Sequence, residues 1–195
     1  MDSNRRGILA VKPRRAAPTV LKQHLLRVAD ALSELQLPYM IIGAFALSAW
    51  GRPRATLDLD LIIQAPEIPD ALVRSLYALG FRPDKQWEKY NPNIRAFHKR
   101  FRSGRTALDI LLKRDAHDAA AFLRRKKKRF DGRYLWFPSA EDLLIQKLKV
   151  GRPQDFIDAT GIIDRMRGKL DRRYLIKWAR KLGLVPELAH VWPRK

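Results

Sequence analysis

Asp58 and Asp60 lie two positions apart in the run Leu57–Ile63, in which all the remaining residues are leucine or isoleucine. Burying a carboxylate without a partner is costly. In a β-strand alternate side chains share a face, so both acids would point one way while the leucines pack on the core. Two neighbouring carboxylates repel each other unless a cation lies between them. The pattern therefore predicts a strand that carries a site for a hard divalent cation such as Mg²⁺.

A third acid, Asp109, also stands alone within an apolar run, Ala107–Leu112. If its strand neighbours Leu57–Ile63, three carboxylates bracket two metal ions, which suits in-line phosphoryl or nucleotidyl displacement. The alternatives are an edge strand with a solvated acidic face for the first pair, and an ion pair with arginine for Asp109. Ile62 and Ile63 argue against the edge strand, because they continue the run without polar alternation.

Hydrophobic periodicity predicts the elements that position these acids. Strands are expected at 39–43, 57–63 and 134–137, and a hairpin within 94–112 that turns at Ser103–Gly104. Helices are expected at 19–36, 44–51, 68–79, 116–128, 140–151, 153–166 and 171–183, with a polar turn region at 82–93. This order predicts an α/β (α+β) fold, with a mixed sheet flanked by helices at 19–137. A small helical part at 138–195 follows, and a basic tail at 1–18 precedes the core.

Composition narrows the function classes. The chain has 40 Lys and Arg against 20 Asp and Glu, a net charge of +20, which favours a polyanionic partner such as nucleic acid. The alternative is a protein whose surface is simply basic. Without cysteine there is no disulfide, zinc-thiolate site or thiol nucleophile. The longest apolar stretch, 39–50, is too short to span a bilayer and no secretory signal is recognisable, so we expect a cytoplasmic protein with no membrane partner.

Gly43 lies where a strand turns into a helix, a junction at which backbone N–H groups can face an anion. Ile42, Gly43 and Ala44 are followed by thirteen residues and then by Asp58-Leu59-Asp60-Leu61. This spacing resembles the signature of the polymerase-β-like nucleotidyltransferases. The RATLDLD stretch at 54–60, and the lysine-bearing helix followed by RPQDFID at 152–158, are similar to the AbiE-like nucleotidyltransferase toxins of abortive infection.

The resemblance implies a nucleotidyltransferase core and a set of roles. The metal ligands would be Asp58, Asp60 and Asp109. The catalytic residues would be the same three acids together with Lys147 and Asp155. The substrate-binding residues would be Gly43, Ala44, Arg54, Thr56 and Asp158. Ala44 departs from the family, which usually has Gly or Ser there, although its backbone N–H is kept. Read without the resemblance, Asp155 would cap a helix and Lys147 would be a solvated lysine.

A run of six cations is the candidate nucleic-acid contact, through salt-sensitive attraction to phosphates. It comprises Arg124, Arg125, Lys126, Lys127, Lys128 and Arg129. The alternative is a solvated helix end, where cations also suit the helix dipole.

Together these features predict an enzyme, a nucleotidyltransferase that depends on Mg²⁺ or Mn²⁺ and moves a nucleoside monophosphate from an NTP to an acceptor hydroxyl. RNA, possibly tRNA, is the favoured acceptor because of the charge, and a protein hydroxyl or a small molecule is the alternative. The toxin resemblance adds a possible antitoxin partner. The first alternative is a catalytically silent module of the same fold that binds nucleic acid, a reading that Ala44 invites. The second is a metal-dependent nuclease, which the spacing from Gly43 to the acids disfavours.

Overall fold

The computed structural model describes residues 19–192, in which helices flank a five-stranded sheet and a separate two-stranded ribbon. The sheet strands are β1 (Tyr39–Ile41), β2 (Asp58–Ile63), β3 (Arg82–Pro83), β4 (His98–Ser103) and β5 (Thr106–Leu112), and the ribbon strands are β6 (Lys126–Phe130) and β7 (Arg133–Phe137). The helices are α1 (Val20–Glu34), α2 (Gly43–Trp50), α3 (Asp70–Ala78), α4 (Lys85–Tyr90), α5 (Ala116–Arg124), α6 (Ala140–Val150), α7 (Pro153–Arg165), α8 (Arg172–Leu182) and α9 (Val185–Val191). This is the mixed α/β fold that the sequence predicts.

The sheet has the strand order β1-β2-β5-β4-β3, and its register places the acids beside one another. Strands β2 and β5 pair in parallel with Asp60 opposite Asp109, whereas β1 and β4 run antiparallel to them. Leu59, Leu61 and Ile63 are fully buried on the other face of β2. The predicted alternation of β2 is therefore confirmed, and one face of the sheet gathers the carboxylates of two central strands.

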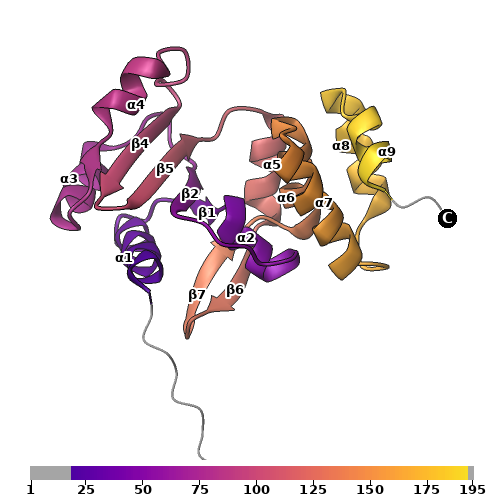
Figure 1. Ribbon diagram of the computed structural model, residues 1–195, viewed down its shortest axis with the longest axis horizontal. Helices are drawn as coiled ribbons and strands as arrows, with labels where there is room; N and C mark the ends of the chain where they lie inside the picture. The colour runs from indigo at the N-terminus through magenta and orange to yellow at the C-terminus, as the bar shows by residue number, and fades with distance from the viewer. Residues whose placement is uncertain (1–18, 193–195) are drawn as a thin grey trace, which may run out of the picture.

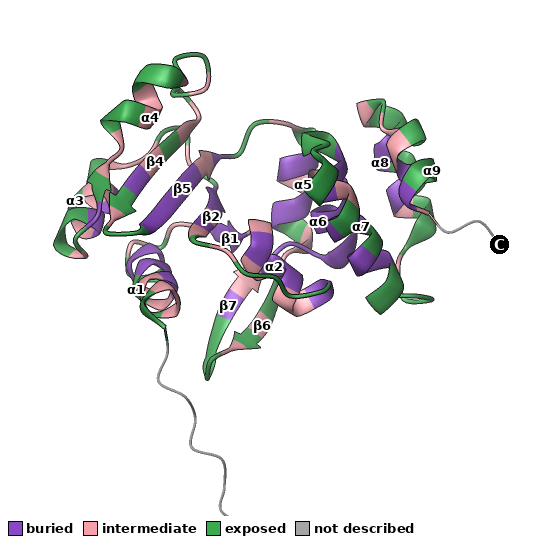
Figure 2. Cartoon of the chain, in the orientation of Figure 1, coloured by how far each residue is buried: buried purple, intermediate pink, exposed green. Residues whose placement is uncertain are grey.

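Helices lie on both sides of the sheet that carries this acidic face (Figure 1). Helix α2 packs on β2, while α6 and α7 form a pair that α8 and α9 extend away from the sheet. Buried residues line the sides of α6 and α7 that face the sheet and each other (Figure 2). A hydrogen bond of 2.8 Å from Trp50 Nε1 to the Pro138 carbonyl ties α2 to the start of α6. The helical part thus closes over one end of the sheet and supplies a second wall for a cleft.

Most predicted elements are confirmed, including the hairpin that turns at Gly104 and the three consecutive helices after residue 138. The helix expected at 116–128 is wrong in its last four residues, because it ends at Arg124 and Lys126–Phe130 form a strand. That strand is held by antiparallel pairing with β7, a contact that no local pattern of lysines predicts. The region 82–93 contains α4, which Asp84 caps by accepting from the Trp87 N–H at 3.0 Å, and α9 was not predicted at all. The expected tail at 1–18 lies outside the described residues.

Candidate active site

Asp58 and Asp60 are the acids of β2, and within residues 19–192 neither carboxylate has a hydrogen bond or an ion pair from a protein side chain. Both are half-buried. Thr56 fixes the start of the strand, since its Oγ1 accepts from the Asp58 N–H at 3.0 Å and donates to the Asp58 carbonyl at 3.2 Å. The pair is thus held on a rigid strand with its oxygens left available.

Gly43 opens α2 directly against Asp60. Its φ is +63°, and a Cβ at this position would lie 2.0 Å from Asp60 Oδ2. The Ile42 N–H donates to the Asp60 carbonyl at 2.9 Å, which fixes the two backbones at this spacing. No side chain caps the helix at Ile42, so the first N–H groups of α2, including that of Ala44, are not satisfied by a cap. Only glycine lets this helix end approach a carboxylate so closely, and helix N-termini of this kind can bind anions.

This close approach gives a prediction. Gly43→Ala is expected to displace the Asp60 carboxylate and to abolish binding of a metal-bound nucleotide, measured by calorimetry. Gly183→Ala is the matched control, because Gly183 has φ +69° but no atom within 4 Å of its Cβ position. Each variant bears the cost of left-handed backbone, about 1 kcal/mol of unfolding free energy. Equal nucleotide binding by the two variants would refute the role of Gly43.

The Asp60 carboxyl is electrostatically strained. Burial, followed by the charges of Asp109 and Asp58, raises its pKa from 3.8 to about 6. A divalent cation bound between these carboxylates would offset their repulsion. Between pH 3.8 and 6 the folded protein binds more protons here than the unfolded chain, so ionising Asp60 costs stability as pH rises through that window.

A pH dependence follows from this pKa. We expect the affinity for Mg²⁺, followed as a rise in melting temperature or by calorimetry, to increase about tenfold from pH 5 to pH 7, because only ionised Asp60 binds the ion. Asp60→Asn should bind more weakly and lose most of that dependence. An affinity independent of pH in the wild-type protein would contradict the assignment of Asp60 as a ligand.

Asp109 faces the same cleft but has partners. Arg100 donates from Nε and Nη2 to its two oxygens at 2.8 and 2.6 Å, and His98 Nε2 lies 2.8 Å from Oδ1. Burial raises the pKa of the Asp109 carboxyl, but the hydrogen bonds from His98 and Arg100 and the charge of Arg100 outweigh it and leave the pKa below its usual value. The arginine pair that the sequence left open as an alternative is therefore present, and Asp109 is an ionised, fully engaged carboxylate.

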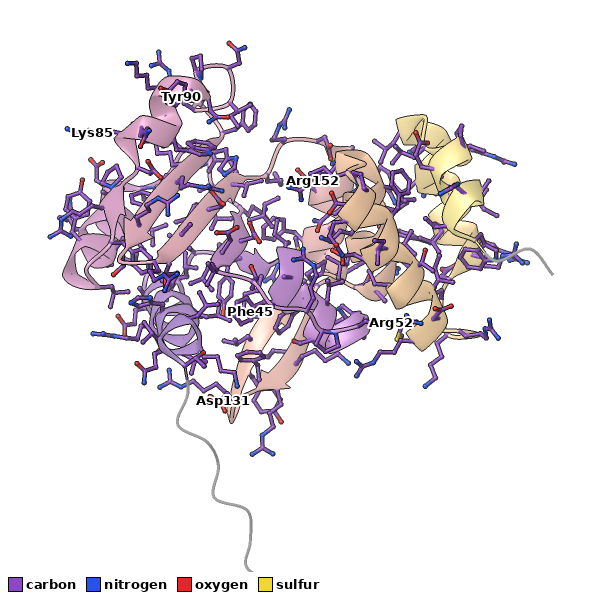
Figure 3. The ribbon with its side chains drawn as sticks, in the orientation of Figure 1. Phe45, Arg52, Lys85, Tyr90, Asp131 and Arg152 are labelled. Atoms are coloured by element: carbon purple, nitrogen blue, oxygen red, sulfur yellow. The ribbon has the colours of Figure 1, made fainter. Side chains whose placement is uncertain are left out.

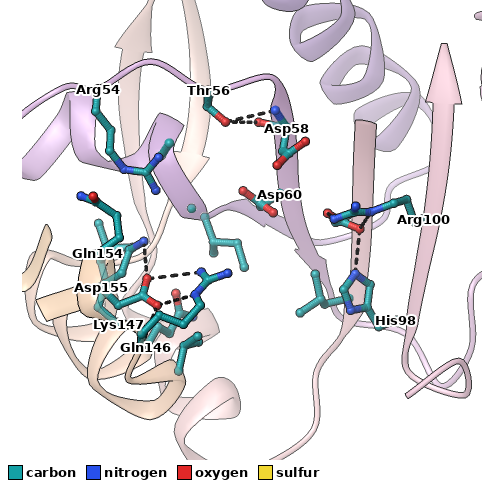
Figure 4. Close-up of a pocket in the computed structure, with 18 residues that line it drawn as sticks. Arg54, Thr56, Asp58, Asp60, His98, Arg100, Gln146, Lys147, Gln154 and Asp155 are labelled. Carbon is teal, nitrogen blue, oxygen red and sulfur yellow. Dashed lines mark hydrogen bonds and ion pairs between the residues drawn. The ribbon is translucent and has the colours of Figure 1, made fainter. Parts of the chain in front are cut away.

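The opposite wall comes from α6, α7 and the loop before β2 (Figure 4). Lys147 is 5% exposed, and its Nζ lies 3.0 Å from Asp155 Oδ1 and 2.8 Å from Asp158 Oδ2. Arg152 Nε donates to Asp155 Oδ2 at 2.7 Å, and Arg54 Nε to Asp158 Oδ1 at 3.2 Å. Burial raises the pKa of both carboxyls, yet the donated hydrogen bonds and cationic charges outweigh it and leave both pKa values lowered. Lys147 is a buried ion-pair centre, so the solvated lysine is excluded.

All of these residues except Asp158 border one cleft with a volume of about 590 Å³. Nine of the ten predicted catalytic and substrate-binding residues line it: Gly43, Ala44, Arg54, Thr56, Asp58, Asp60, Asp109, Lys147 and Asp155. The tenth, Asp158, lies behind the wall and holds Lys147 and Arg54. Every arginine and lysine of the lining is engaged by Asp109, Asp155 or Asp158, so Asp58 and Asp60 are left as two carboxylates without a cationic partner.

A second acidic group, unlike Asp58 and Asp60, has a cationic partner. The side-chain atoms of Asp115, His117 and Asp118 that could bind a metal ion lie within 4.8 Å of one another. This is the compact group of three such side chains found in residues 19–192. Lys149 Nζ already lies 2.6 Å from Asp115 Oδ2 and 3.3 Å from Asp118 Oδ1. Asp115 also caps α5 by accepting from the Asp118 N–H at 2.8 Å. These acids are neutralised and serve the start of a helix, whereas Asp58 and Asp60 have no cationic partner and offer the carboxylate oxygens that a hard divalent cation prefers.

The six predicted nucleic-acid residues do not act as one patch. Arg124 ends α5 and pairs with Glu141 and Asp142 at 3.2 and 3.3 Å, so its charge is used inside the protein. The other five, Arg125, Lys126, Lys127, Lys128 and Arg129, run into the β6 strand, and their side chains alternate between its two faces. Figure 3 places Asp131, at the tip of this ribbon, away from Arg152 at the cleft.

Sequence reasoning missed His98, Arg100, Arg152, Gln146 and Gln154, which also line the cleft. A signal existed for Arg100. The turn at Gly104 pairs Ser103 with Thr106, and counting back along the hairpin places Arg100 opposite Asp109. His98 lies two residues further along and therefore shares the face of Arg100. Arg152 and Gln154 also had a local signal, because Arg152 lies three positions before Asp155 and Gln154 four before Asp158, the spacings at which side chains at a helix start and along a helix meet.

Comparisons with known proteins give the fold a context. No protein-family profile and no curated protein sequence matches the chain. Among solved structures, the antibiotic-resistance factor ANT(2'')-Ia in solution superposes with a TM-score of 0.59 at 14% identity, over 86% of this chain and 96% of that one. The chain has the nucleotidyltransferase fold.

Two further structures agree. ANT(2'')-Ia in complex with adenylyl-2''-tobramycin gives a TM-score of 0.59 at 18% identity, over 83% of this chain and 97% of that one. The lincosamide antibiotic adenylyltransferase LnuA with bound lincomycin gives 0.56 at 13% identity, over 74% and 98%. Identities this low establish the fold alone.

Proposed function

We propose that this protein is a magnesium-dependent nucleotidyltransferase that moves a nucleoside monophosphate from an NTP to an acceptor hydroxyl. The observation that carries the proposal is the unpartnered carboxylate pair Asp58 and Asp60, set against the N-terminus of α2 at Gly43 within a nucleotidyltransferase fold. Two carboxylates and a helix end at one place suit a divalent cation and the phosphates that it binds.

In this reaction the acceptor oxygen bonds to the α-phosphorus, the bond to the bridging oxygen breaks, and pyrophosphate leaves with its electron pair. Asp58 and Asp60 would hold Mg²⁺ or Mn²⁺, which supplies positive charge to the phosphates. The backbone N–H groups at Gly43 and Ala44 would face the triphosphate, and an N–H is retained even though Ala44 lacks a hydroxyl. Asp109 would help to activate the acceptor hydroxyl, and would take up its proton once one of its hydrogen bonds from Arg100 is released.

The remaining cleft residues position these groups. For Asp109 to bind an ion as a third ligand, Arg100 must give up one of its two hydrogen bonds, which would free the guanidinium to face a phosphate. Lys147, Asp155 and Asp158 would fix the wall formed by α6 and α7, and Arg54 and Thr56 would border the nucleotide. The division into a core at 19–137 and a helical part at 138–195 belongs to the same proposal.

The acceptor and setting are proposed from the sequence and the charge. The net charge of +20 favours RNA, possibly tRNA. The AbiE-like motif at 54–60 favours a cytoplasmic toxin with an antitoxin protein as its partner. No helix among residues 19–192 is long and apolar enough to cross a membrane. A small-molecule hydroxyl is the second candidate acceptor, because the neighbours ANT(2'')-Ia and LnuA are named for antibiotics.

The experiment incubates the protein with each α-labelled NTP and Mg²⁺, and with total RNA, tRNA, aminoglycoside and lincosamide acceptors in separate reactions. We expect label on RNA, lost when EDTA is added. Label on an antibiotic alone would move the proposal to the second acceptor. Absence of transfer to every acceptor, together with RNA binding that is unchanged in Asp58→Asn, would favour a silent binding module.

A further inference from the structure

The ribbon β6–β7 presents a surface outside the cleft that combines cations with aromatic rings. Opposite residues of an antiparallel ribbon share a face, so Lys127 lies with Trp136, and Arg129 with Tyr134. Leu135 and Phe137 belong to the other face, and both are buried in the core. We call the solvent side, together with Arg125 just before β6, the outer ribbon face. It comprises Arg125, Lys127, Arg129, Tyr134 and Trp136.

Of the two aromatic rings of the outer ribbon face, Tyr134 is exposed, whereas Trp136 is half-buried and flanked by charge. The side chain of Tyr134 is 64% exposed. The Arg125 guanidinium lies 4.6 Å and the Lys127 ammonium 5.3 Å from the centroid of the Trp136 ring. A hollow of about 380 Å³ separates this face from the turn between α1 and β1, and Arg125, Lys127, Tyr134 and Trp136 line one side of it.

These cations have no acidic partner. Residues 125–137 contain six Lys and Arg and a single acid, Asp131. Within residues 19–192 no ion pair engages Arg125, Lys127 or Arg129, in contrast to every arginine and lysine of the cleft. The outer ribbon face is thus an uncompensated positive surface, whose natural complement is a polyanion.

The aromatic rings specify which polyanion. Single-stranded nucleic acid is bound by grooves in which cations contact the phosphates and aromatic side chains stack on bases. An acidic protein surface would use the cations but offers no flat ring for Tyr134 and Trp136 to stack on. We propose that the outer ribbon face binds a single strand of RNA. The choice of RNA rests on the acceptor proposed above, whereas binding to a single strand does not.

The test is fluorescence anisotropy of labelled oligouridine, without NTP, over a series of salt concentrations. Tyr134→Ala is expected to weaken binding about fivefold or more through loss of a stacking contact. Lys127→Ala should weaken binding and lower the slope of log K against log salt by about 0.7, the value for one phosphate contact on a single strand. The matched controls are Lys126→Ala, an exposed lysine on the other face of the same strand, and Tyr90→Ala, a 71% exposed tyrosine on α4. Both should bind as the wild type.

The outcomes are separable from those of the proposed function, because the assay contains no nucleotide and Asp60→Asn should bind oligouridine normally. Strand binding that depends on Tyr134 and Lys127 supports the inference even if no transfer is ever detected. Equal losses in Lys126→Ala and Lys127→Ala, or no effect of Tyr134→Ala, would overturn it whether or not transfer occurs. Full competition by polyglutamate would indicate a protein partner, and binding of oligodeoxythymidine but not oligouridine would overturn the choice of RNA.

Discussion

Asp60→Asn is expected to lower the proposed nucleotidyl transfer by about a thousandfold or more, because it removes a proposed metal ligand and with it several kcal/mol of transition-state stabilisation. The same change should raise the melting temperature at pH 8 in the absence of metal. The reason is that the raised pKa of Asp60 marks an ionised carboxylate that destabilises the folded state. Single-turnover transfer and thermal unfolding of the same sample measure both effects.

The opposite signs of the two effects make this prediction specific. A substitution that damaged the fold would lower both activity and melting temperature. Asp70→Asn is the matched control, because Asp70 is an exposed aspartate at the start of α3, and it should change neither quantity. Wild-type transfer rates in Asp60→Asn would remove the carboxylate pair from the reaction.

Lys147→Met is expected to lower the free energy of unfolding by about 3 kcal/mol. The substitution leaves Asp155 and Asp158, 1% and 5% exposed, without the ammonium that lies between them. Breaking a buried ion pair from one side costs this much because a charge stays buried without its partner. Arg152 and Arg54 still contact the two acids and limit the loss. Urea unfolding at pH 7 provides the measurement.

Two comparisons define the origin of that loss. Lys149→Met removes a more exposed lysine of the same helix, paired with Asp115 at 2.6 Å, and should cost less than about 1 kcal/mol. Combining Lys147→Met with Asp155→Asn and Asp158→Asn should recover most of the stability, because no buried carboxylate then remains charged and the side chains of Arg152 and Arg54, 69% and 35% exposed, reach solvent. If Lys147→Met costs no more than Lys149→Met, the buried ion-pair centre has no structural role.

The parts of the site that lie close together in sequence were predictable. Strand alternation alone placed Asp58 and Asp60 on one face, and the strand-to-helix junction marked Gly43 as a position where backbone N–H groups can face an anion. The close contact between Gly43 and Asp60 explains why that position requires glycine, which the sequence indicated only through a resemblance. Asp109 was expected on a neighbouring strand, and the register of β2 with β5 brings it opposite Asp60.

The parts that depend on long-range packing were not predictable. The lysine-rich strand β6 has the composition of a solvated helix end, and only its pairing with β7 makes it extended. The sequence singled out Asp155 and Asp158, the partners of Lys147. The burial of Lys147 between them depends on how α6 and α7 pack. The same holds for Arg54, which reaches Asp158 across 104 positions of the chain. Local patterns thus indicate which residues face inward, whereas tertiary contacts decide which charges remain unpaired.

The most direct test of the central claim is a calorimetric titration with a non-hydrolysable NTP, with and without Mg²⁺. Wild-type protein is compared with the double variant Asp58→Asn, Asp60→Asn. The account predicts that the wild-type protein binds the nucleotide tightly only when Mg²⁺ is present, and that the double variant loses this metal-dependent binding while remaining folded. Equal binding of the nucleotide in EDTA, or metal-dependent binding that persists in the double variant, would contradict it.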